Sequence, residues 1–143
     1  MYVIIIIIII IIIIIHIIIH IPLPIHLLAS SYIASLLKES STIEELSLSG
    51  CHGILISKVA EGLRSSKTIT HFHLNNCGLI DDDIKTICNA VEHHPTLKTL
   101  TMDENNMMVD GFQSIFEMLK TNGMINNMGN LRSLPEVSRA FFG

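Results

Sequence analysis

Apolar and polar positions alternate in a recurring pattern beyond residue 40 of the chain. Three segments share the pattern L-x-x-L-x-L-x-x-N/C, with Ile, Phe or Met allowed at the apolar places. They begin at Thr42, Thr68 and Thr96, so they recur at nearly equal intervals along the chain. Alternation with a period of two is typical of a strand with one buried face. Each segment therefore predicts a short strand.

A second apolar pattern, now at helical spacing, follows each predicted strand. Apolar residues three and four positions apart lie on one face of a helix, so each of these patterns predicts a helix. Residues 27–39 carry the same pattern and predict the helix of a preceding, incomplete unit. The apolar helix positions after the three strands are Ile56, Val59, Ala60 and Leu63, then Ile84, Ile87, Cys88 and Val91, then Phe112, Ile115, Phe116 and Leu119.

The predicted fold class is α/β: a leucine-rich-repeat solenoid of about three repeats, with one strand and one helix per repeat and a parallel inner sheet. The repeats span residues 27–123, and residues 124–143 are a degenerate fourth repeat that serves as a C-terminal cap or tail. We expect Cys51, Cys77 and Asn105 at the bend after each strand, where a small polar side chain can bond to turn backbone. Cys51 and Cys77 are therefore interpreted as unreactive. The inward-pointing strand residues are Leu46, Leu48, Phe72, Leu74, Leu100 and Met102.

Two stretches resemble a known group of proteins. The strand pattern Thr-Ile-x-x-Leu-x-Leu-x-x-Cys at 42–51 and the Val-Ala-Glu-Gly-Leu-Arg-Ser stretch at 59–65 resemble ribonuclease-inhibitor-like leucine-rich repeats, as in NOD-like receptors. The resemblance implies a curved solenoid that recognises a protein partner or holds a receptor inactive. The nucleotide-binding loop G-x-x-x-x-G-K-[ST] of such receptors is absent from the sequence, so the chain could be a fragment of a larger receptor or regulator.

Residues 1–26 form a poly-isoleucine segment of low complexity. Residues 4–15 are all isoleucine, and no charged side chain occurs from Tyr2 to Leu28. Such a stretch exceeds the roughly 20 residues that cross a bilayer, which predicts a membrane anchor at residues 2–28. Lys38 is the nearest basic residue and would keep the repeats in the cytosol. Two other interpretations stay open: a tandem DNA repeat wrongly taken as coding sequence, and a cleaved signal peptide.

Net charge and cysteine content indicate which partners and which cellular compartment to expect. The net charge is −4, and no basic stripe occurs of the kind that attracts phosphate backbones, which argues against a nucleic-acid partner. The three cysteines are odd in number and form no C-x-x-C pair, which favours a reducing compartment and a cytoplasmic location. No recognisable set of nucleophile, base and oxyanion donor occurs, so the sequence predicts neither an enzyme nor a cofactor.

The candidate binding residues lie on the concave sheet face, between the inward-pointing leucines. Concave solenoid faces present rigid, adjacent side chains, and we therefore predict that a protein partner binds there. A solvated polar face without a partner is the alternative. The candidates form three rows across the strands: Glu45, His71 and Thr99; Ser47, His73 and Thr101; Ser49, Asn75 and Asp103.

Other polar residues have simpler explanations. His71, His73 and Glu45 would supply only three metal ligands, and an H-x-H pair has little specificity, so no metal site is predicted. His93 and His94 end a helix before Pro95 and are interpreted as a helix cap, where a cation would suit the dipole. Residues 81–83 are three aspartates before a helix, which predicts an N-cap.

The sequence as a whole predicts a non-catalytic protein-interaction module that binds its partner on the concave face. The alternative function is a leucine-rich-repeat receptor tethered to a membrane by residues 2–28. Its repeats would then face the cytosol.

Overall fold

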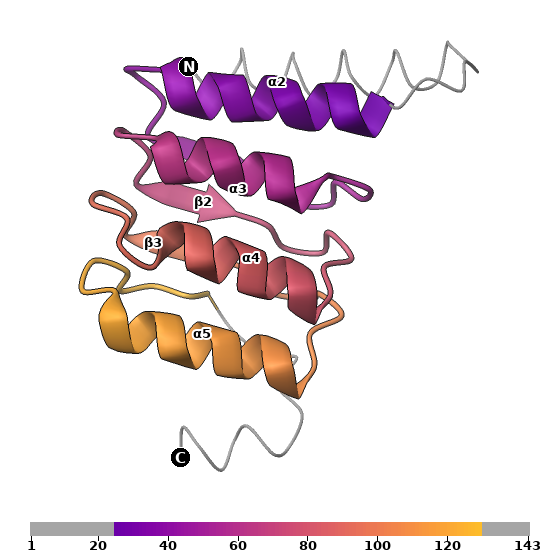
Figure 1. Ribbon diagram of the computed structural model, residues 1–143, viewed down its shortest axis with the longest axis vertical. Helices are drawn as coiled ribbons and strands as arrows, with labels where there is room; N and C mark the ends of the chain where they lie inside the picture. Colours follow the sequence, from indigo (N-terminus) through magenta and orange to yellow (C-terminus); the bar gives the residue numbers. More distant parts are fainter. Residues whose placement is uncertain (1–24, 130–143) are drawn as a thin grey trace.

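The computed structural model describes residues 25–129 as alternating helices and short strands. The four helices of this part of the chain stack side by side in one layer, and the strands form a second layer behind them (Figure 1). The elements in chain order are α2 (Ile25–Glu39), β1 (Glu45–Ser47), α3 (Ile56–Ser65), β2 (His71–His73), α4 (Asp81–Val91), β3 (Thr99–Thr101) and α5 (Val109–Thr121).

The three strands form a parallel sheet in the order β1-β2-β3. Each strand is followed by a helix that returns the chain to the same end of the sheet, and this crossover makes neighbouring strands parallel. Backbone hydrogen bonds continue beyond the strands: Leu48 N donates to His73 O at 2.9 Å, and Leu74 N donates to Thr101 O at 2.8 Å. The register places Glu45, His71 and Thr99 in one row, Leu46, Phe72 and Leu100 in the next, and Ser47, His73 and Thr101 in the third.

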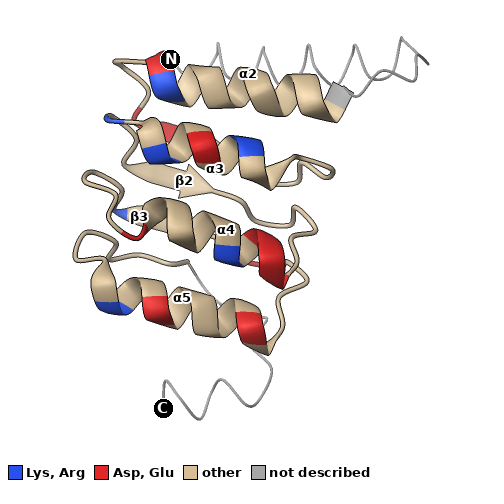
Figure 2. Cartoon of the chain, viewed as in Figure 1, with Lys and Arg blue, Asp and Glu red and all other residues tan. Residues whose placement is uncertain are grey.

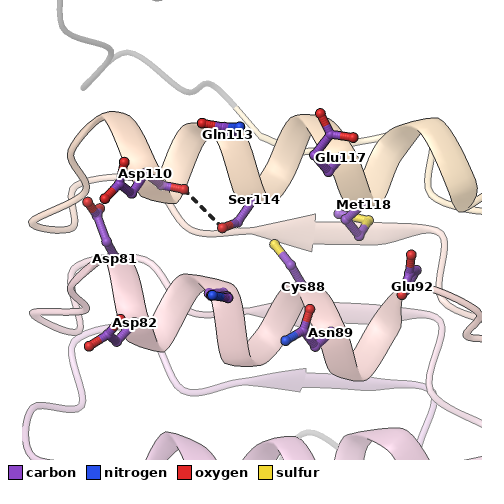
Figure 3. Close-up of a pocket in the computed structure, with 11 residues that line it drawn as sticks. Asp81, Asp82, Cys88, Asn89, Glu92, Asp110, Gln113, Ser114, Glu117 and Met118 are labelled. Atoms are coloured by element: carbon purple, nitrogen blue, oxygen red, sulfur yellow. Dashed lines mark hydrogen bonds between the residues drawn. The ribbon is translucent and has the colours of Figure 1, made fainter.

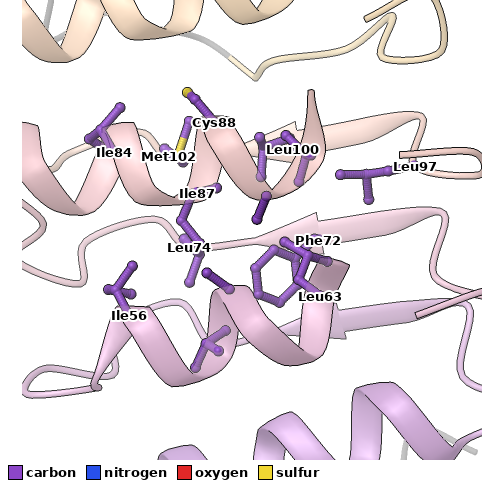
Figure 4. Close-up of a cluster of buried hydrophobic side chains, with 14 of the residues drawn as sticks. Ile56, Leu63, Phe72, Leu74, Ile84, Ile87, Cys88, Leu97, Leu100 and Met102 are labelled. Carbon is purple, nitrogen blue, oxygen red and sulfur yellow. The ribbon is translucent and has the colours of Figure 1, made fainter. Parts of the chain in front are cut away.

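The hydrophobic core lies between the sheet and the helices (Figure 4). All six strand residues that were predicted to point inward are buried, which confirms that part of the pattern. The helices meet them with buried aliphatic side chains such as Leu63, Ile87 and Ile115. Burying one such side chain contributes about 1.5 to 3 kcal/mol to the free energy of unfolding. The apolar stripe of each helix is therefore what holds it on the sheet.

The bends after the strands are fixed by side chains that bond to backbone. Asn105 Oδ1 accepts from Cys77 N at 2.9 Å and from Leu79 N at 3.1 Å. Its Nδ2 donates to Leu74 O at 2.8 Å and to Met102 O at 2.9 Å. At the preceding bend, Cys77 Sγ donates to Leu48 O at 3.1 Å. The prediction that residues at this position bond to turn backbone is confirmed for Asn105 and Cys77.

The aspartates at the start of α4 do not act as predicted. The N-cap position is occupied by Ile80, and residues 81–83 form the first helical turn. Asp83 Oδ2 accepts from Ile80 N at 3.1 Å, and Asp81 Oδ1 accepts from Met108 N at 2.6 Å. The N-cap prediction is therefore wrong in position, because Asp81 instead fixes the loop that leads into α5.

Helix α2 packs on α3 at very short range. It begins at Ile25, two residues earlier than the pattern predicted. A Cβ added to Gly62 on α3 would lie 2.5 to 2.9 Å from backbone atoms of Ala34 on α2, so the backbones themselves are in contact there. The opposite side of α2 exposes Leu28 (74%) and Tyr32 (51%). The helix thus packs closely with one face and leaves apolar side chains exposed on the other.

None of the helices in residues 25–129 is long and apolar enough to cross a membrane. The predicted span at residues 2–28 lies outside the described residues except for its last four, and these form the first turn of α2. The predicted transmembrane helix therefore finds no support in the part of the chain that the structure describes.

The segment after α5 reaches the open edge of β3. Asn127 forms an isolated parallel bridge with Thr99, in which Leu100 N donates to Asn127 O at 2.9 Å. Ile125 is buried and joins the core. Residues 124–129 thus extend the sheet, while the rest of the predicted cap or tail, residues 130–143, lies outside the described residues.

The predicted fold class, a leucine-rich-repeat solenoid, is corrected by these observations. The described part of the chain is a small two-layer α/β body, with four helices on one face of a single three-stranded sheet. One core cluster runs through it from Leu37 to Ile125. The recurring apolar segments located the strands and helices because they reflect local patterns of burial. The apolar segments do not indicate the overall shape of the sheet layer and the helix layer.

Candidate functional site: the open sheet face

The sheet face opposite the helices carries all nine predicted binding residues, and we call it the open sheet face. The register aligns the first two predicted rows across the three strands. The third row lies just beyond the strands, where hydrogen bonds join Asn75 to Ser49 and to Asp103. Ser47 and Ser49 on the β1 side are exposed, whereas His71, His73 and Asn75 in the middle are half-buried. The face is therefore most accessible at β1. Its members are Glu45, Ser47, Ser49, His71, His73, Asn75, Thr99, Thr101 and Asp103.

The middle of the open sheet face is organised around His73. Its Nδ1 hydrogen-bonds to Thr101 Oγ1 at 2.9 Å, and its Nε2 lies 3.6 Å from Glu45 Oε1. The ring therefore touches side chains from both neighbouring strands. His71 turns elsewhere, because its Nδ1 hydrogen-bonds to Thr70 Oγ1 at 2.8 Å. The two histidines thus have different partners although they lie on the same strand.

A second chain of hydrogen bonds links the strand ends. Asn75 N donates to Ser49 Oγ at 3.2 Å, and Asp103 N donates to Asn75 Oδ1 at 2.9 Å. Ser49 Oγ also accepts from Ser47 Oγ at 3.3 Å. These bonds hold short polar side chains in fixed positions, so a partner would meet a preorganised surface that loses little entropy on binding.

The β3 side of the face is covered. Thr99 is 6% exposed and Thr101 is 7% exposed. Asn127 pairs with Thr99, and a Cβ on Gly129 would lie 3.0 Å from Thr101 Cγ2, so the segment after α5 contributes to this cover. Of the nine candidates, Thr99 and Thr101 therefore offer little surface to a partner, and Thr101 instead supports His73.

Metal binding has no basis in the described residues. No group of three or more His, Cys, Asp or Glu side chains in residues 25–129 could hold an ion. His73 approaches Glu45, but His71 is engaged by Thr70.

A groove of about 410 Å³ lies on the other side of the molecule, between α4 and α5 (Figure 3). Carboxylates line it from both helices, at the first turn of α4 and along α5 (Figure 2). At its base, burial raises the pKa of the Cys88 thiol to about 12. A thiol with that pKa is not a nucleophile near neutral pH. The lining residues are Asp81, Asp82, Lys85, Cys88, Asn89, Glu92, Asp110, Gln113, Ser114, Glu117 and Met118.

The other two cysteines are also held as thiols. Burial raises the pKa of Cys51 and of Cys77. Cys77 in addition donates its Sγ hydrogen to Leu48 O. The interpretation of these two cysteines as unreactive residues of the bends agrees with both observations.

Sequence reasoning missed the role of His94. It was interpreted as a cationic helix cap, but it is 3% exposed and burial lowers its pKa. Both ring nitrogens bond to backbone of other segments, with Nε2 3.0 Å from Leu63 O and Nδ1 3.2 Å from Leu97 N. The position of His94 in the sequence could have revealed this role. A polar residue stands three places before the first aliphatic residue of each strand segment, at Ser40, Ser66, His94 and Asn122.

Part of the sequence and the described fold are similar to known proteins. No family model matches the chain. A human protein named "Centrosomal protein of 78 kDa" is 31% identical over 88 residues, which cover 59% of this chain and 12% of that protein. The chain thus matches only a small part of that relative's length.

Among solved structures, the domain titled "Leiomodin-1 Actin-Binding Site 2 (ABS2)" superposes with a TM-score of 0.64 at 19% identity. The superposition covers 68% of this chain and 58% of that one. At this identity the likeness shows the fold alone. The correction of the fold class rests on this likeness together with the two layers described above. The resemblance to ribonuclease-inhibitor-like repeats of NOD-like receptors stays untested.

Proposed function

We propose that this chain is a non-catalytic protein-interaction module that binds a protein partner on the open sheet face. One observation carries the proposal: polar side chains from adjacent parallel strands are fixed in rows by hydrogen bonds between strands, with His73 at the centre. Rigid rows of this kind suit recognition of a protein surface, because few rotamers are lost when the partner binds.

The comparisons support a binding role of this general kind. The solved domain with the same fold is titled as an actin-binding site, and the sequence relative is named as a centrosomal protein. Neither name describes a catalysed reaction. We extend this to the chain as a cytoplasmic protein with a protein partner and without catalytic activity. Anchoring of the chain to a membrane has no support from these relatives.

The raised thiol pKa values support the absence of catalysis. Cys88 in the groove and Cys51 and Cys77 at the bends are held protonated by burial. Within residues 25–129 this removes the strongest candidate nucleophiles. The groove between α4 and α5 then offers carboxylates and one amine without an activated nucleophile.

A pair of matched substitutions tests the binding face. Ser49→Arg places a bulky cation on the exposed part of the open sheet face, and Ser57→Arg places the same side chain on the exposed side of α3. A photoreactive residue at Ser47 first identifies the partner by cross-linking, with purified actin included as one candidate. Affinity for the purified partner is then measured for both variants.

We expect Ser49→Arg to weaken binding by about tenfold or more, about 1.4 kcal/mol, because a bulky cation on the exposed part of the face would keep the partner from close contact there. Ser57→Arg should bind and melt like the parent, because Ser57 is exposed. Ser49→Arg also loses the hydrogen bonds that Ser49 Oγ accepts from Asn75 N and Ser47 Oγ, at a cost of about 1 kcal/mol, so affinity is measured well below the melting temperature of both variants. Equal affinity of the two variants, or stronger loss with Ser57→Arg, would place binding elsewhere on the molecule.

A further inference from the structure

Four polar side chains occupy equivalent positions ahead of the strand segments. Each accepts a hydrogen bond from the backbone N–H of the residue three places later in the chain. The bonds are Ile43 N to Ser40 Oγ at 3.0 Å, Ile69 N to Ser66 Oγ at 3.4 Å, Leu97 N to His94 Nδ1 at 3.2 Å and Ile125 N to Asn122 Oδ1 at 2.8 Å. Only His94 among these four side chains titrates near neutral pH.

The hydrogen bonds of His94 define its protonation state. Nδ1 faces two backbone donors, Leu97 N at 3.2 Å and Thr96 N at 3.4 Å, so it must be an unprotonated acceptor. Nε2 lies 3.0 Å from Leu63 O, which only accepts, so Nε2 carries the hydrogen. The neutral Nε2–H tautomer is therefore the one form that satisfies every bond.

Asn122, which follows α5 as His94 follows α4, makes the same arrangement of bonds without a titratable group. Its Oδ1 accepts from Met124 N and Ile125 N, both at 2.8 Å, and its Nδ2 donates to Val91 O at 2.6 Å. Val91 lies at the end of α4, as Leu63 lies near the end of α3. An amide thus makes the same set of bonds as the neutral imidazole.

Protonation of His94 would break the arrangement. A second ring hydrogen on Nδ1 would point at two N–H groups, so the bonds from Leu97 N, which is buried, and from Thr96 N, which is part-buried, would both be lost. The imidazolium charge would also sit in a site that water barely reaches. The ring can relieve both conflicts only by leaving the turn.

We propose that His94 is a pH-sensitive latch, which holds the turn between α4 and β3 closed when the imidazole is neutral and opens it when the imidazole is protonated. The turn leads directly into β3 and is tied by Leu63 O to the end of α3. Opening would therefore loosen β3, the strand that supports His73 through Thr101. The latch itself does not depend on the proposed partner binding.

Charged neighbours do not account for the behaviour of this histidine. Burial lowers its pKa, and the bond to Leu63 O opposes that shift only in part, with no neighbouring charge among the causes. Most of the nearby charged groups are exposed. The titratable side chains on the segments packed against it are Arg64 and Lys67 at the end of α3, Glu92 and His93 at the end of α4, Lys98 beside β3 and Lys120 at the end of α5.

The sign of the pH effect follows from the lowered pKa. The unfolded chain takes up a proton at His94 near its ordinary pKa of about 6.5, whereas the folded chain does so only at lower pH. Stability from His94 is therefore complete above that value and is lost as the pH falls through it toward the folded pKa. Opening of the turn should appear in the same window.

Hydrogen exchange of the full chain tests the latch. We expect exchange in residues 96–101, corrected for the intrinsic effect of pH, to increase as the pH falls from about 7.5 to about 5.5. His94→Asn should remove this increase, because Asn122 shows that an amide makes the same bonds. His93→Asn, at the exposed neighbouring histidine, should retain it.

Ring NMR of the parent protein gives a test that needs no variant. We expect the neutral Nε2–H tautomer at about pH 7.5, with ring protonation and loss of the Leu97 amide signal in step. The latch is refuted if exchange in the turn is the same at both pH values, if His94→Asn keeps the increase, or if the ring titrates without a change at Leu97.

Discussion

At the scale of single residues, buried polar side chains decide how the chain turns between its elements. Asn105 is 8% exposed, and its side chain bonds to five backbone groups, three in residues 74–79 and two in residues 102–103. A backbone N–H or C=O buried without a partner costs about 1 to 3 kcal/mol. Such a residue therefore stabilises the bend by satisfying groups that the sheet and the helix both leave unpaired.

Removing this side chain gives the first prediction at this scale. We expect Asn105→Ala to lower the free energy of unfolding by about 2 to 4 kcal/mol, because several backbone groups lose their partner at once. The neighbouring Asn106 is exposed, and only its backbone N–H is bonded, to Leu79 O. Asn106→Ala should therefore change stability by less than about 0.5 kcal/mol. Urea unfolding of both variants measures the difference, and similar losses would contradict this role for Asn105.

At the scale of elements, the approach of α2 to α3 depends on a missing side chain. Gly62 lies inside α3, where glycine costs about 1 kcal/mol relative to alanine in an exposed helix. Close helix packing requires glycine at this position, because a Cβ there would lie 2.5 to 2.9 Å from backbone atoms of Ala34. Backbone atoms of a packed helix cannot move aside individually, so the whole of α2 would have to shift.

The corresponding prediction compares two glycines. We expect Gly62→Ala to destabilise the protein by about 1 to 3 kcal/mol, since the packing conflict outweighs the gain in helix propensity. Gly123 has no atom within 4 Å of an added Cβ, so Gly123→Ala should be neutral or slightly stabilising. Thermal melts of the two variants provide the measurement. A Gly62→Ala protein as stable as the parent would show that α2 is not held at this distance.

At the scale of the whole molecule, one core joins every described element. The buried cluster includes residues from α2, from all three strands and from helices α3, α4 and α5. Leu74 lies near its middle, after β2, and is fully buried (Figure 4). Because the sheet and the helices pack on one another through this cluster, a defect at Leu74 weakens the contact between the two layers.

We therefore expect Leu74→Ala to cost about 2 to 5 kcal/mol, a large part of the stability of a domain of this size. Unfolding should remain a single transition when followed by far-ultraviolet circular dichroism and by hydrogen exchange, because the core is continuous. A variant that melts like the parent would contradict the central place of Leu74, and two separate transitions would contradict the single core.

Apolar spacing along the chain was enough to predict the local elements and the residues that face the core. Strand and helix positions follow from apolar spacings within short windows of the chain, and burial of residues such as Phe72 and Leu100 follows from the same spacings. The alignment of the open sheet face could also be predicted, because equivalent positions in the recurring segments set the register. These features depend on neighbours along the chain.

Features that join distant segments depend on the tertiary structure and could not be predicted from the sequence. Burial among these segments lowers the pKa of His94, and Asp81 accepts a hydrogen bond from Met108 N, 27 residues further along the chain. Thr99 is covered because Asn127 returns to the edge of β3. The recurring apolar pattern likewise did not predict the two-layer shape. In each case the deciding contact joins particular side chains or backbone groups a whole strand and helix apart, and the apolar pattern does not indicate which of these groups meet.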